Sequence, residues 1–247
     1  MPEQPPNFII KWGSKGEGDG QFFSPGAVAV DSSDNVYVAD ELNHRIQKFD
    51  SAGTFITKWG SRGAGDGQFD FPTGVALDSS DNVYVADTNN TRIQKFDSDG
   101  TFITKWGSRG AGDGQFQEGK TGVALDSYGN VYVADSNNTR IQKFDSAGTF
   151  ITKWGSFGVG DGQFISHSGV AVDSSDNVYV ADTFNHRIQK FDSAGTFISK
   201  WGSQGAGDGQ FTHPQEAALD SSGNVYVADG SNNRIQKFGY ELVPIGE

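Results

Sequence analysis

The sequence contains no cysteine, one methionine and seven prolines. The absence of cysteine excludes disulfide bonds, thiolate zinc sites and cysteine nucleophiles. No apolar run approaches the roughly 20 residues of a membrane-spanning helix, and residues 1–7 lack the hydrophobic region of a secretory signal. The sequence therefore indicates no compartment, and the chain could be a segment of a larger protein.

Helix-forming composition is also lacking. Leucine is scarce, whereas aromatic residues make up 13% of the chain and glycine occurs 34 times. Aromatic and β-branched residues with many glycines favour strands and tight turns. No segment keeps an apolar period of about 3.6 residues, so we expect almost no helix.

Positive charge is in deficit, with 19 Lys and Arg against 31 Asp and Glu and a formal net charge of −12. An acidic surface repels phosphate backbones, which disfavours general binding to nucleic acids or anionic membranes.

One segment, Lys-Trp-Gly-Ser-x-Gly-x-Gly-Asp-Gly-Gln-Phe, occurs five times. Its tryptophans are separated by 47, 47, 48 and 47 residues and are Trp12, Trp59, Trp106, Trp154 and Trp201. A period of this length is typical of a ring or array of small units. The repeats span roughly residues 13–59, 60–106, 107–154, 155–201, and 202–238 together with 8–12, followed by a tail at 239–247.

The second copy shows the pattern of one unit. It predicts four short strands at 74–78, 82–87, 92–96 and 101–106, separated by turns rich in Asp, Ser, Asn and Gly. Four antiparallel strands per unit, repeated radially, predict an all-β chain that forms a single β-propeller domain over residues 1–247.

The two ends of the chain predict how the ring closes. The chain begins with a fourth strand at 8–12 and finishes with a third strand at 234–238. We therefore expect strand 8–12 to complete the last blade and close a ring of five blades, which would remove the open sheet edges. The tail at 239–246 could compete as a degenerate fourth strand, although Pro244 disfavours it. We expect a monomer, with domain swapping as the alternative because the repeats are nearly identical.

These residues resemble the NHL repeat family. The resemblance rests on Gly-Val-Ala-Leu-Asp, on Asn-Val-Tyr-Val-Ala-Asp-Thr-Asn-Asn-Thr-Arg-Ile-Gln-Lys-Phe and on the tryptophan segment, over roughly residues 8–238. It implies a β-propeller, which in this family more often has six blades. It implies no single function, because the family includes interaction scaffolds, sensor domains, RNA-binding regulators and a metal-dependent lyase.

Several recurrent residues are expected to be structural. An Asp and an Arg flank the loop between the second and third strands of each copy, and the tryptophans are expected to pack between blades. The pairs are Asp40/Arg45, Asp87/Arg92, Asp135/Arg140, Asp182/Arg187 and Asp229/Arg234. The spacing of Asp78 and Asp81 resembles paired calcium ligands, but Gly129 and Gly223 replace the second aspartate in other copies. That exchange favours a turn with positive φ, so we predict no metal and no cofactor.

The copies differ mainly in two connections, which are the crossover between units and the loop between the second and third strands. In a four-stranded antiparallel blade both connections lie at the same end, so one face of the disc should be individual. Binding residues concentrate on loops held by a rigid scaffold. The candidate binding residues on this face are Phe157, Ile165, His167, Phe184, His186, His213, Gln215 and Glu216.

These observations favour a non-catalytic binding or scaffold module that presents its individual face to a protein or a small ligand. The first alternative is a metal-dependent lyase or hydrolase at the channel mouth, near His167, His213 and Glu216. The second is RNA binding on the individual face, which carries Lys15, Arg62, Arg109 and Lys120 but which the net charge disfavours.

Overall fold

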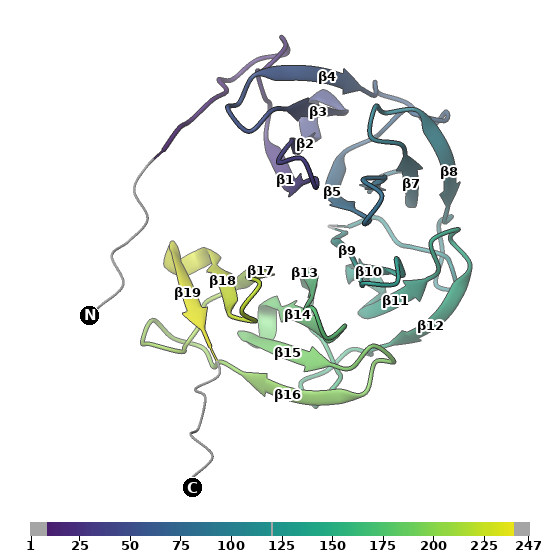
Figure 1. Cartoon of the computed structure of the whole chain (residues 1–247). Helices are drawn as coiled ribbons and strands as arrows, with labels where there is room; N and C mark the ends of the chain where they lie inside the picture. Colours follow the sequence, from purple (N-terminus) through teal and green to yellow (C-terminus); the bar gives the residue numbers. More distant parts are fainter. Residues whose placement is uncertain (1–8, 120, 240–247) are drawn as a thin grey trace, which may run out of the picture.

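The computed structural model describes residues 9–119 and 121–239. It consists of five small antiparallel sheets arranged around a central axis (Figure 1). The first strand of each sheet lies nearest the axis and later strands lie progressively further out. The predicted all-β propeller with five blades is confirmed.

The strands follow the chain in order. Blade 1 contains β1 (Pro25–Val30), β2 (Val36–Asp40), β3 (Arg45–Phe49) and β4 (Phe55–Trp59). Blade 2 contains β5 (Pro72–Leu77), β6 (Val83–Asp87), β7 (Arg92–Phe96) and β8 (Phe102–Trp106). Blade 3 contains β9 (Val123–Leu125), β10 (Val131–Asp135), β11 (Arg140–Phe144) and β12 (Phe150–Trp154). Blade 4 contains β13 (His167–Val172), β14 (Val178–Asp182), β15 (Arg187–Phe191) and β16 (Phe197–Trp201). Blade 5 contains β17 (Pro214–Leu219), β18 (Val225–Asp229) and β19 (Arg234–Phe238).

Helical structure is limited to single turns. The described residues contain four 3₁₀ turns, all between the second and third strands of a blade. They are η1 (Glu41–Asn43), η2 (Ser136–Asn138), η3 (Thr183–Asn185) and η4 (Gly230–Asn232). None of the helices in the described part of the chain is long and apolar enough to cross a bilayer.

Burial follows the position of each strand in its blade. All five residues of β6 are buried, because a blade covers each face of this sheet. The outermost strand β8 instead alternates between half-buried and exposed residues, as expected for a strand with one solvated face. The Val-Tyr-Val-Ala run therefore belongs to the doubly covered strand.

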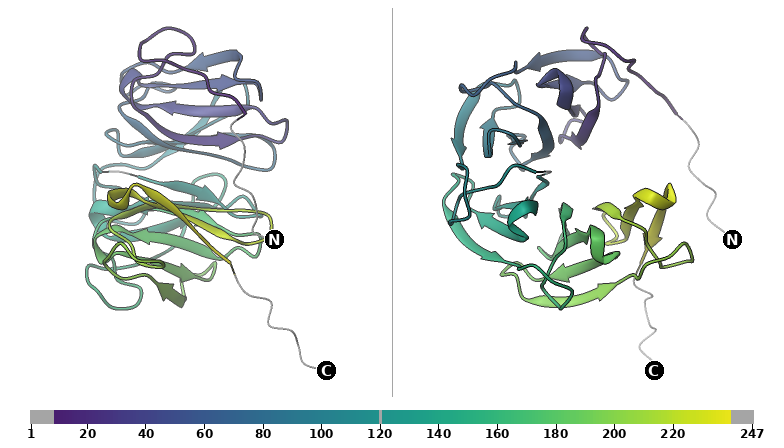
Figure 2. Two further views of the ribbon diagram at one scale, coloured as in Figure 1. Left: turned by 90° about the vertical axis from the view of Figure 1, so that its left-hand side faces the viewer. Right: turned by 180° about the vertical axis from the view of Figure 1, so that it is seen from behind.

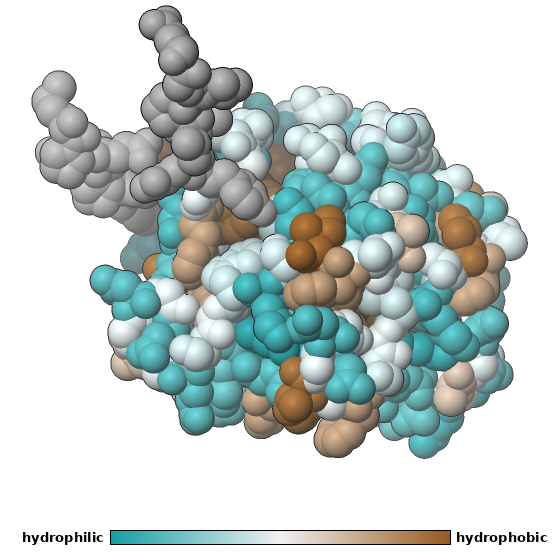
Figure 3. Space-filling model, turned by 90° about the horizontal axis from the view of Figure 1, so that it is seen from below, coloured by the Kyte–Doolittle hydropathy of each residue, from teal (hydrophilic) through white to brown (hydrophobic). Residues whose placement is uncertain are grey.

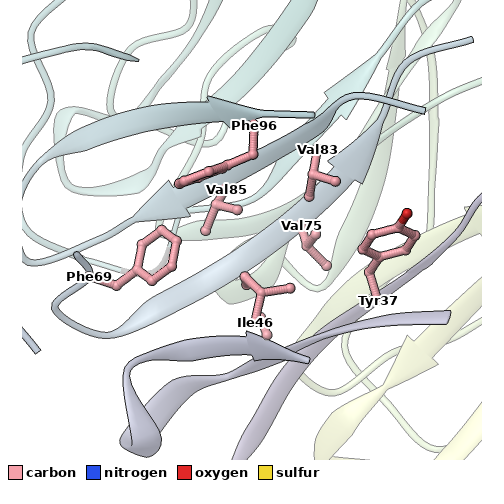
Figure 4. Close-up of a cluster of buried hydrophobic side chains, with 8 residues drawn as sticks. Tyr37, Ile46, Phe69, Val75, Val83, Val85 and Phe96 are labelled. Carbon is pink, nitrogen blue, oxygen red and sulfur yellow. The ribbon is translucent and has the colours of Figure 1, made fainter. Parts of the chain in front are cut away.

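The hydrophobic core lies between neighbouring blades. Between blades 1 and 2, one sheet contributes Tyr37, Ala39 and Ile46, and the next contributes Phe69, Val75, Val83, Val85 and Phe96 (Figure 4). Equivalent clusters lie at the other three contacts between consecutive blades. Each inner blade thus packs one face against the preceding blade and the other face against the following blade, and the same interface is repeated.

The recurrent tryptophans pack across these interfaces. The ring of Trp59, at the end of β4, lies 5.8 Å from that of Phe96 in the next blade. A Cβ atom on Gly100, which has φ of +87°, would lie 2.5 Å from Cδ2 of Trp59. This turn therefore needs glycine both for its left-handed conformation and for the space that the indole occupies.

The ring is open between blades 5 and 1, contrary to the predicted closure by strand 8–12 (Figures 1 and 2). Residue 8 and the competing tail at 240–246 lie outside the described residues. Residues 9–12 remain beside blade 1, where the ring of Trp12 lies 5.9 Å from that of Phe49. This is the contact that Trp59 makes with Phe96, so Trp12 has the expected relation to blade 1. Within the described residues, blade 5 is three-stranded and β19 pairs only with β18.

Glu216 borders the opening at a position where three other blades have glycine. The equivalent positions in blades 2, 3 and 4 are Gly74, Gly122 and Gly169, where an added Cβ would lie 2.7–2.9 Å from the backbone of the next innermost strand. Successive inner strands approach closely at these glycines, whereas blade 1 has Ala27 at the equivalent position and still packs against blade 2. Glu216 lies on β17, which borders the gap, and its side chain lines the space where β1 would have to approach.

The opening is testable by distance measurement, because the chain has no cysteine and accepts spin labels at chosen sites. Ser33, Ser80 and Ser222 are exposed and occupy equivalent turns in blades 1, 2 and 5. Pulsed electron paramagnetic resonance should give a longer distance between spin labels in a Ser33→Cys/Ser222→Cys variant than in a Ser33→Cys/Ser80→Cys variant. Equal distances would show a closed five-blade ring and would contradict the open arrangement.

Candidate functional site

The individual face of the disc is formed by the crossovers between units and the loops that follow each second strand. Direct hydrogen bonds join the two kinds of loop. In blade 2, Asn90 Nδ2 donates to the carbonyl oxygen of Gly63 at 2.8 Å. This confirms that both variable connections lie at one end of the blades.

A buried aspartate anchors these loops in every blade. In blade 2, Asp87 is fully buried, and its Oδ2 accepts hydrogen bonds from Arg92 Nε (2.7 Å) and Gln94 Nε2 (3.0 Å). Its Oδ1 accepts from the backbone N–H of Asp70 in the crossover at 2.7 Å. The carboxylate therefore connects the loop, the third strand and the crossover.

The arginine completes the same network. Nη1 of Arg92 donates to the Ala64 carbonyl at 2.7 Å, and Nη2 donates to the Gly65 and Gln68 carbonyls at 2.8 Å each. The guanidinium thus hydrogen-bonds three carbonyls of the glycine-rich crossover, of which only that of Gly65 also accepts a bond within its own turn, from the N–H of Gln68. Equivalent bonds recur around Arg45, Arg140, Arg187 and Arg234.

Sequence analysis missed two members of this network, the asparagine and glutamine represented by Asn90 and Gln94. Gln94 Nε2 donates to the Gln68 carbonyl at 2.7 Å, and its Oε1 accepts from the N–H of Gly67 at 3.0 Å. Both residue types recur in all five copies, which was the available signal.

The aspartates that resembled calcium ligands at the opposite end are part of the turns. Asp78 Oδ1 accepts from the N–H groups of Ser80 and Asn82, each at 3.0 Å, and its Oδ2 accepts from the Tyr84 hydroxyl at 3.0 Å. Burial raises the pKa of Asp78, but hydrogen bonds led by that of the Asn82 side chain outweigh burial and hold the pKa below its usual value. Asp81 has φ of +61° and its equivalent Gly129 has +80°, as the turn interpretation predicts.

Phe184, His186 and His213 come together between blades 4 and 5. The ring of His213 lies 5.0 Å from that of Phe184 and 4.9 Å from that of His186. His186 Nδ1 accepts from the backbone N–H of His213 at 3.2 Å, so this histidine also supports the crossover. His44 accepts from the N–H of Phe71 in the same way at 3.2 Å, which sequence analysis had not foreseen.

Phe157 and Val159 extend this cluster along the rim. Phe157 is 70% exposed and Val159 is 69% exposed, and Phe184 is 54% exposed. Asn185 Nδ2 donates to the Gly158 carbonyl at 2.9 Å, so the crossover tip and η3 are in contact. We call Phe157, Val159, Phe184, His186 and His213 the rim patch. Ile165 is half-buried beneath it, and its carbonyl accepts from the N–H of Phe184 at 3.1 Å.

The centre of the ring holds a second candidate site. A cavity of about 130 Å³ is lined by residues of all five innermost strands, including Gly26, Thr73, Thr121, Ser168 and Gln215. Glu216 lines the same cavity and also the cleft between blades 5 and 1. Across residues 9–119 and 121–239, no three His, Asp or Glu side chains gather closely enough to hold a metal ion.

His167 does not present its side chain on the face as the sequence suggested. It is fully buried at the start of β13, and its Nε2 donates to the Arg140 carbonyl at 2.9 Å. Nδ1 has no partner within the described residues. Burial lowers the pKa of His167 to about 4, outweighing that hydrogen bond, so the imidazole is neutral at pH 7.

On the side of the molecule seen in Figure 3, hydrophobic side chains (brown) lie in small groups among hydrophilic ones. Isolated apolar residues are usual on soluble surfaces, whereas a contiguous group can mark an interaction site. Within the rim patch, the ring contacts of His213 with Phe184 and His186 join blades 4 and 5.

These features define a β-propeller whose blades are held by buried Asp–Arg networks and whose loops differ at one face. The NHL repeat model matches residues 22–49, 69–96, 121–144, 168–191 and 211–238, and the chain belongs to this family. No match was found among curated proteins.

Solved structures resemble the chain in fold. A virginiamycin B lyase from Staphylococcus aureus is 11% identical with a TM-score of 0.60, and the match covers 87% of this chain and 69% of that one. An auxiliary nutrient binding protein from Bacteroides ovatus is 16% identical with a TM-score of 0.66, over 89% of this chain and 59% of that one. At these identities the likeness is one of fold alone.

The buried imidazole predicts a pH-dependent stability. Because the folded pKa of His167, about 4, lies below the unfolded value of 6.5, its neutral form is favoured by folding. Its contribution is present above about pH 6.5 and is lost as pH falls toward 4, by roughly 3 kcal/mol at about 1.36 kcal/mol per pKa unit.

A His167→Pro variant should remove this loss, as measured by urea unfolding at pH 7 and pH 4. Proline stands at the equivalent position in blades 1, 2 and 5, after residues with similar φ: Ser24 (59°), Phe71 (55°) and His213 (55°), against 48° for Ser166. Parallel pH profiles for the variant and the original protein would contradict the prediction.

Proposed function

We propose that this NHL propeller is a non-catalytic binding module and that the rim patch of blades 4 and 5 binds a protein partner. The observation that carries the proposal is the exposure of Phe157, Val159 and Phe184 on neighbouring loops. Large apolar side chains at such positions lose water contact when a partner covers them, which favours association.

Comparison between blades supports this assignment. The positions equivalent to Phe157 hold Lys15, Arg62, Arg109 and Gln204, and those equivalent to Phe184 hold Leu42, Asn89, Asn137 and Ser231. The same scaffold therefore holds mainly polar residues at these places elsewhere in the ring. Neither phenylalanine is needed to build the loop, since the loop forms in blades that lack it.

The scaffold beneath the patch is rigid by construction. Arg187 donates through Nη1 to the Val159 carbonyl at 2.8 Å, and Asn185 bonds the neighbouring Gly158. The backbone of such fixed loops loses little further freedom when a partner binds, which lowers the entropic cost of association.

The experiment uses replacements taken from the chain itself. A Phe157→Arg/Phe184→Asn variant introduces the residues found in blade 2, so it should fold normally. Binders are selected against the original protein from a displayed library of natural protein fragments, and their affinities are then measured by surface plasmon resonance. We expect the double variant to bind at least 10-fold more weakly, because a large buried aromatic contributes several kcal/mol at hot spots.

An Ile103→Thr variant serves as the matched control, since Ile103 is 48% exposed on β8, away from the loops. Its affinity should equal that of the original protein. Selected binders that tolerate the double variant but not Ile103→Thr would contradict the assignment of the surface. Stoichiometric metal with turnover at the central cavity would contradict the non-catalytic role.

A further inference from the structure

The third strand of blade 5 offers an open sheet edge. In blades 1 to 4 the third strand pairs on its outer side with a fourth strand of sequence Phe-Ile-Thr/Ser-Lys-Trp. In blade 4 the register places Ile188 opposite Trp201 and Phe191 opposite Phe197. β19 has the same sequence as the other third strands, Arg-Ile-Gln-Lys-Phe, but within the described residues only β18 pairs with it.

An apolar cleft runs beside this edge. It has a volume of about 440 Å³ and lies between blades 5 and 1, with walls that include Val28, Val38, Ala217, Tyr226 and Ile235. Ile235 is 66% exposed, whereas the equivalent Ile188 is fully buried against the next blade. The cleft therefore exposes two halves of the apolar interface that other blades bury.

Charge and aromatic contacts specify what the edge would accept. In blade 4 the fourth strand's Lys200 forms an ion pair with Asp161, and its Trp201 ring lies 6.2 Å from that of Tyr179. Asp208 and Tyr226 occupy the corresponding positions in blade 5. A strand carrying a lysine followed by a tryptophan would meet a carboxylate and an aromatic ring in the same order.

We propose that the β19 edge and the adjoining cleft bind an extended peptide segment of another protein, with the pattern aromatic-Ile-Thr/Ser-Lys-Trp. The segment adds as a fourth antiparallel strand, its main chain hydrogen-bonding along β19 and its tryptophan covering Tyr226. Main-chain pairing at a sheet edge provides affinity, and side-chain contacts provide specificity. This surface is separate from the rim patch, so the two proposals can fail independently.

Residues 9–12, which the sequence predicted to complete blade 5, form no strand and do not pair along β19. Trp12 packs on Phe49 at 5.9 Å, and a Cβ on Gly53 would lie 2.7 Å from Cδ2 of Trp12, so the indole fits closely over the turn of blade 1. Glu216 lines the cleft together with residues of β1. Within residues 9–119 and 121–239, no strand pairs along the outer side of β19.

The probe is a fluorescent peptide with the sequence of residues 148–156, which contains the fourth strand of blade 3. Fluorescence anisotropy with the full chain should show saturable binding. A control peptide with proline in place of Thr152 should bind at least 10-fold more weakly, because proline cannot pair along a strand. Equal binding of the two peptides, or no saturable binding, would overturn the proposal.

Protein variants locate the site. Ile235→Lys should weaken binding at least 10-fold, whereas Ile198→Lys on the exposed face of β16, where Ile198 is 48% exposed, should leave it unchanged. Asp208→Asn should reduce both the affinity and its dependence on salt. Sedimentation velocity provides a further check, since a mass that rises with concentration and falls in Ile235→Lys would show a second copy at the edge and overturn the proposal.

Discussion

The hydrogen bonds of the buried aspartate at the end of each second strand are the interaction on which the rest of the structure depends. A carboxylate such as Asp87 is stable away from water only when it is hydrogen-bonded and paired, and Arg92, Asn90, Gln94 and the Asp70 amide supply those bonds. The loop, the third strand and the crossover are thereby fixed together. The exposed loop side chains can then vary while the blade still forms, because buried hydrogen bonds that recur in all five blades fix the loop backbone.

Repetition of this unit explains both the ring and its opening. Each blade has two different apolar faces, and four interfaces form between the five consecutive blades. One face of blade 1 and one face of blade 5 therefore remain without a neighbouring blade. Glycine at the inner strand lets neighbouring blades approach, as at Gly169 beside Glu216. A glutamate at the last such position is compatible with the fold because β17 borders the cleft and not another blade of this chain.

Much of the fold was predictable from the sequence. The period, the turns and the alternation of Val and Tyr predicted the strands, with β7 at the predicted residues and β5, β6 and β8 within one or two of them. The predicted closure was wrong because matching strand sequences predict which strands can pair, and not whether the two ends of the ring meet. Glu216 borders the opening at a position where blades 2, 3 and 4 have glycine and blade 1 has Ala27.

The site was predictable only in outline. Divergence between copies identified the face and selected Phe184, His186 and His213, which the structure places in contact. It also selected His167, which the structure buries. Sequence comparison between repeats cannot distinguish a substituted core position from a substituted surface position. The supporting role of His186 was likewise invisible, because it depends on the backbone N–H of His213, 27 residues further along the chain.

The most direct test of this account compares two cations of blade 2. Arg92→Leu would leave Asp87 buried without its charged partner, and removing one member of a buried pair typically costs about 3–5 kcal/mol of unfolding free energy. Lys105→Leu removes an exposed ion pair with Asp66, which typically contributes at most about 1 kcal/mol. Urea unfolding should show the large loss for Arg92→Leu alone, whereas equally small losses would contradict the central role of the buried network.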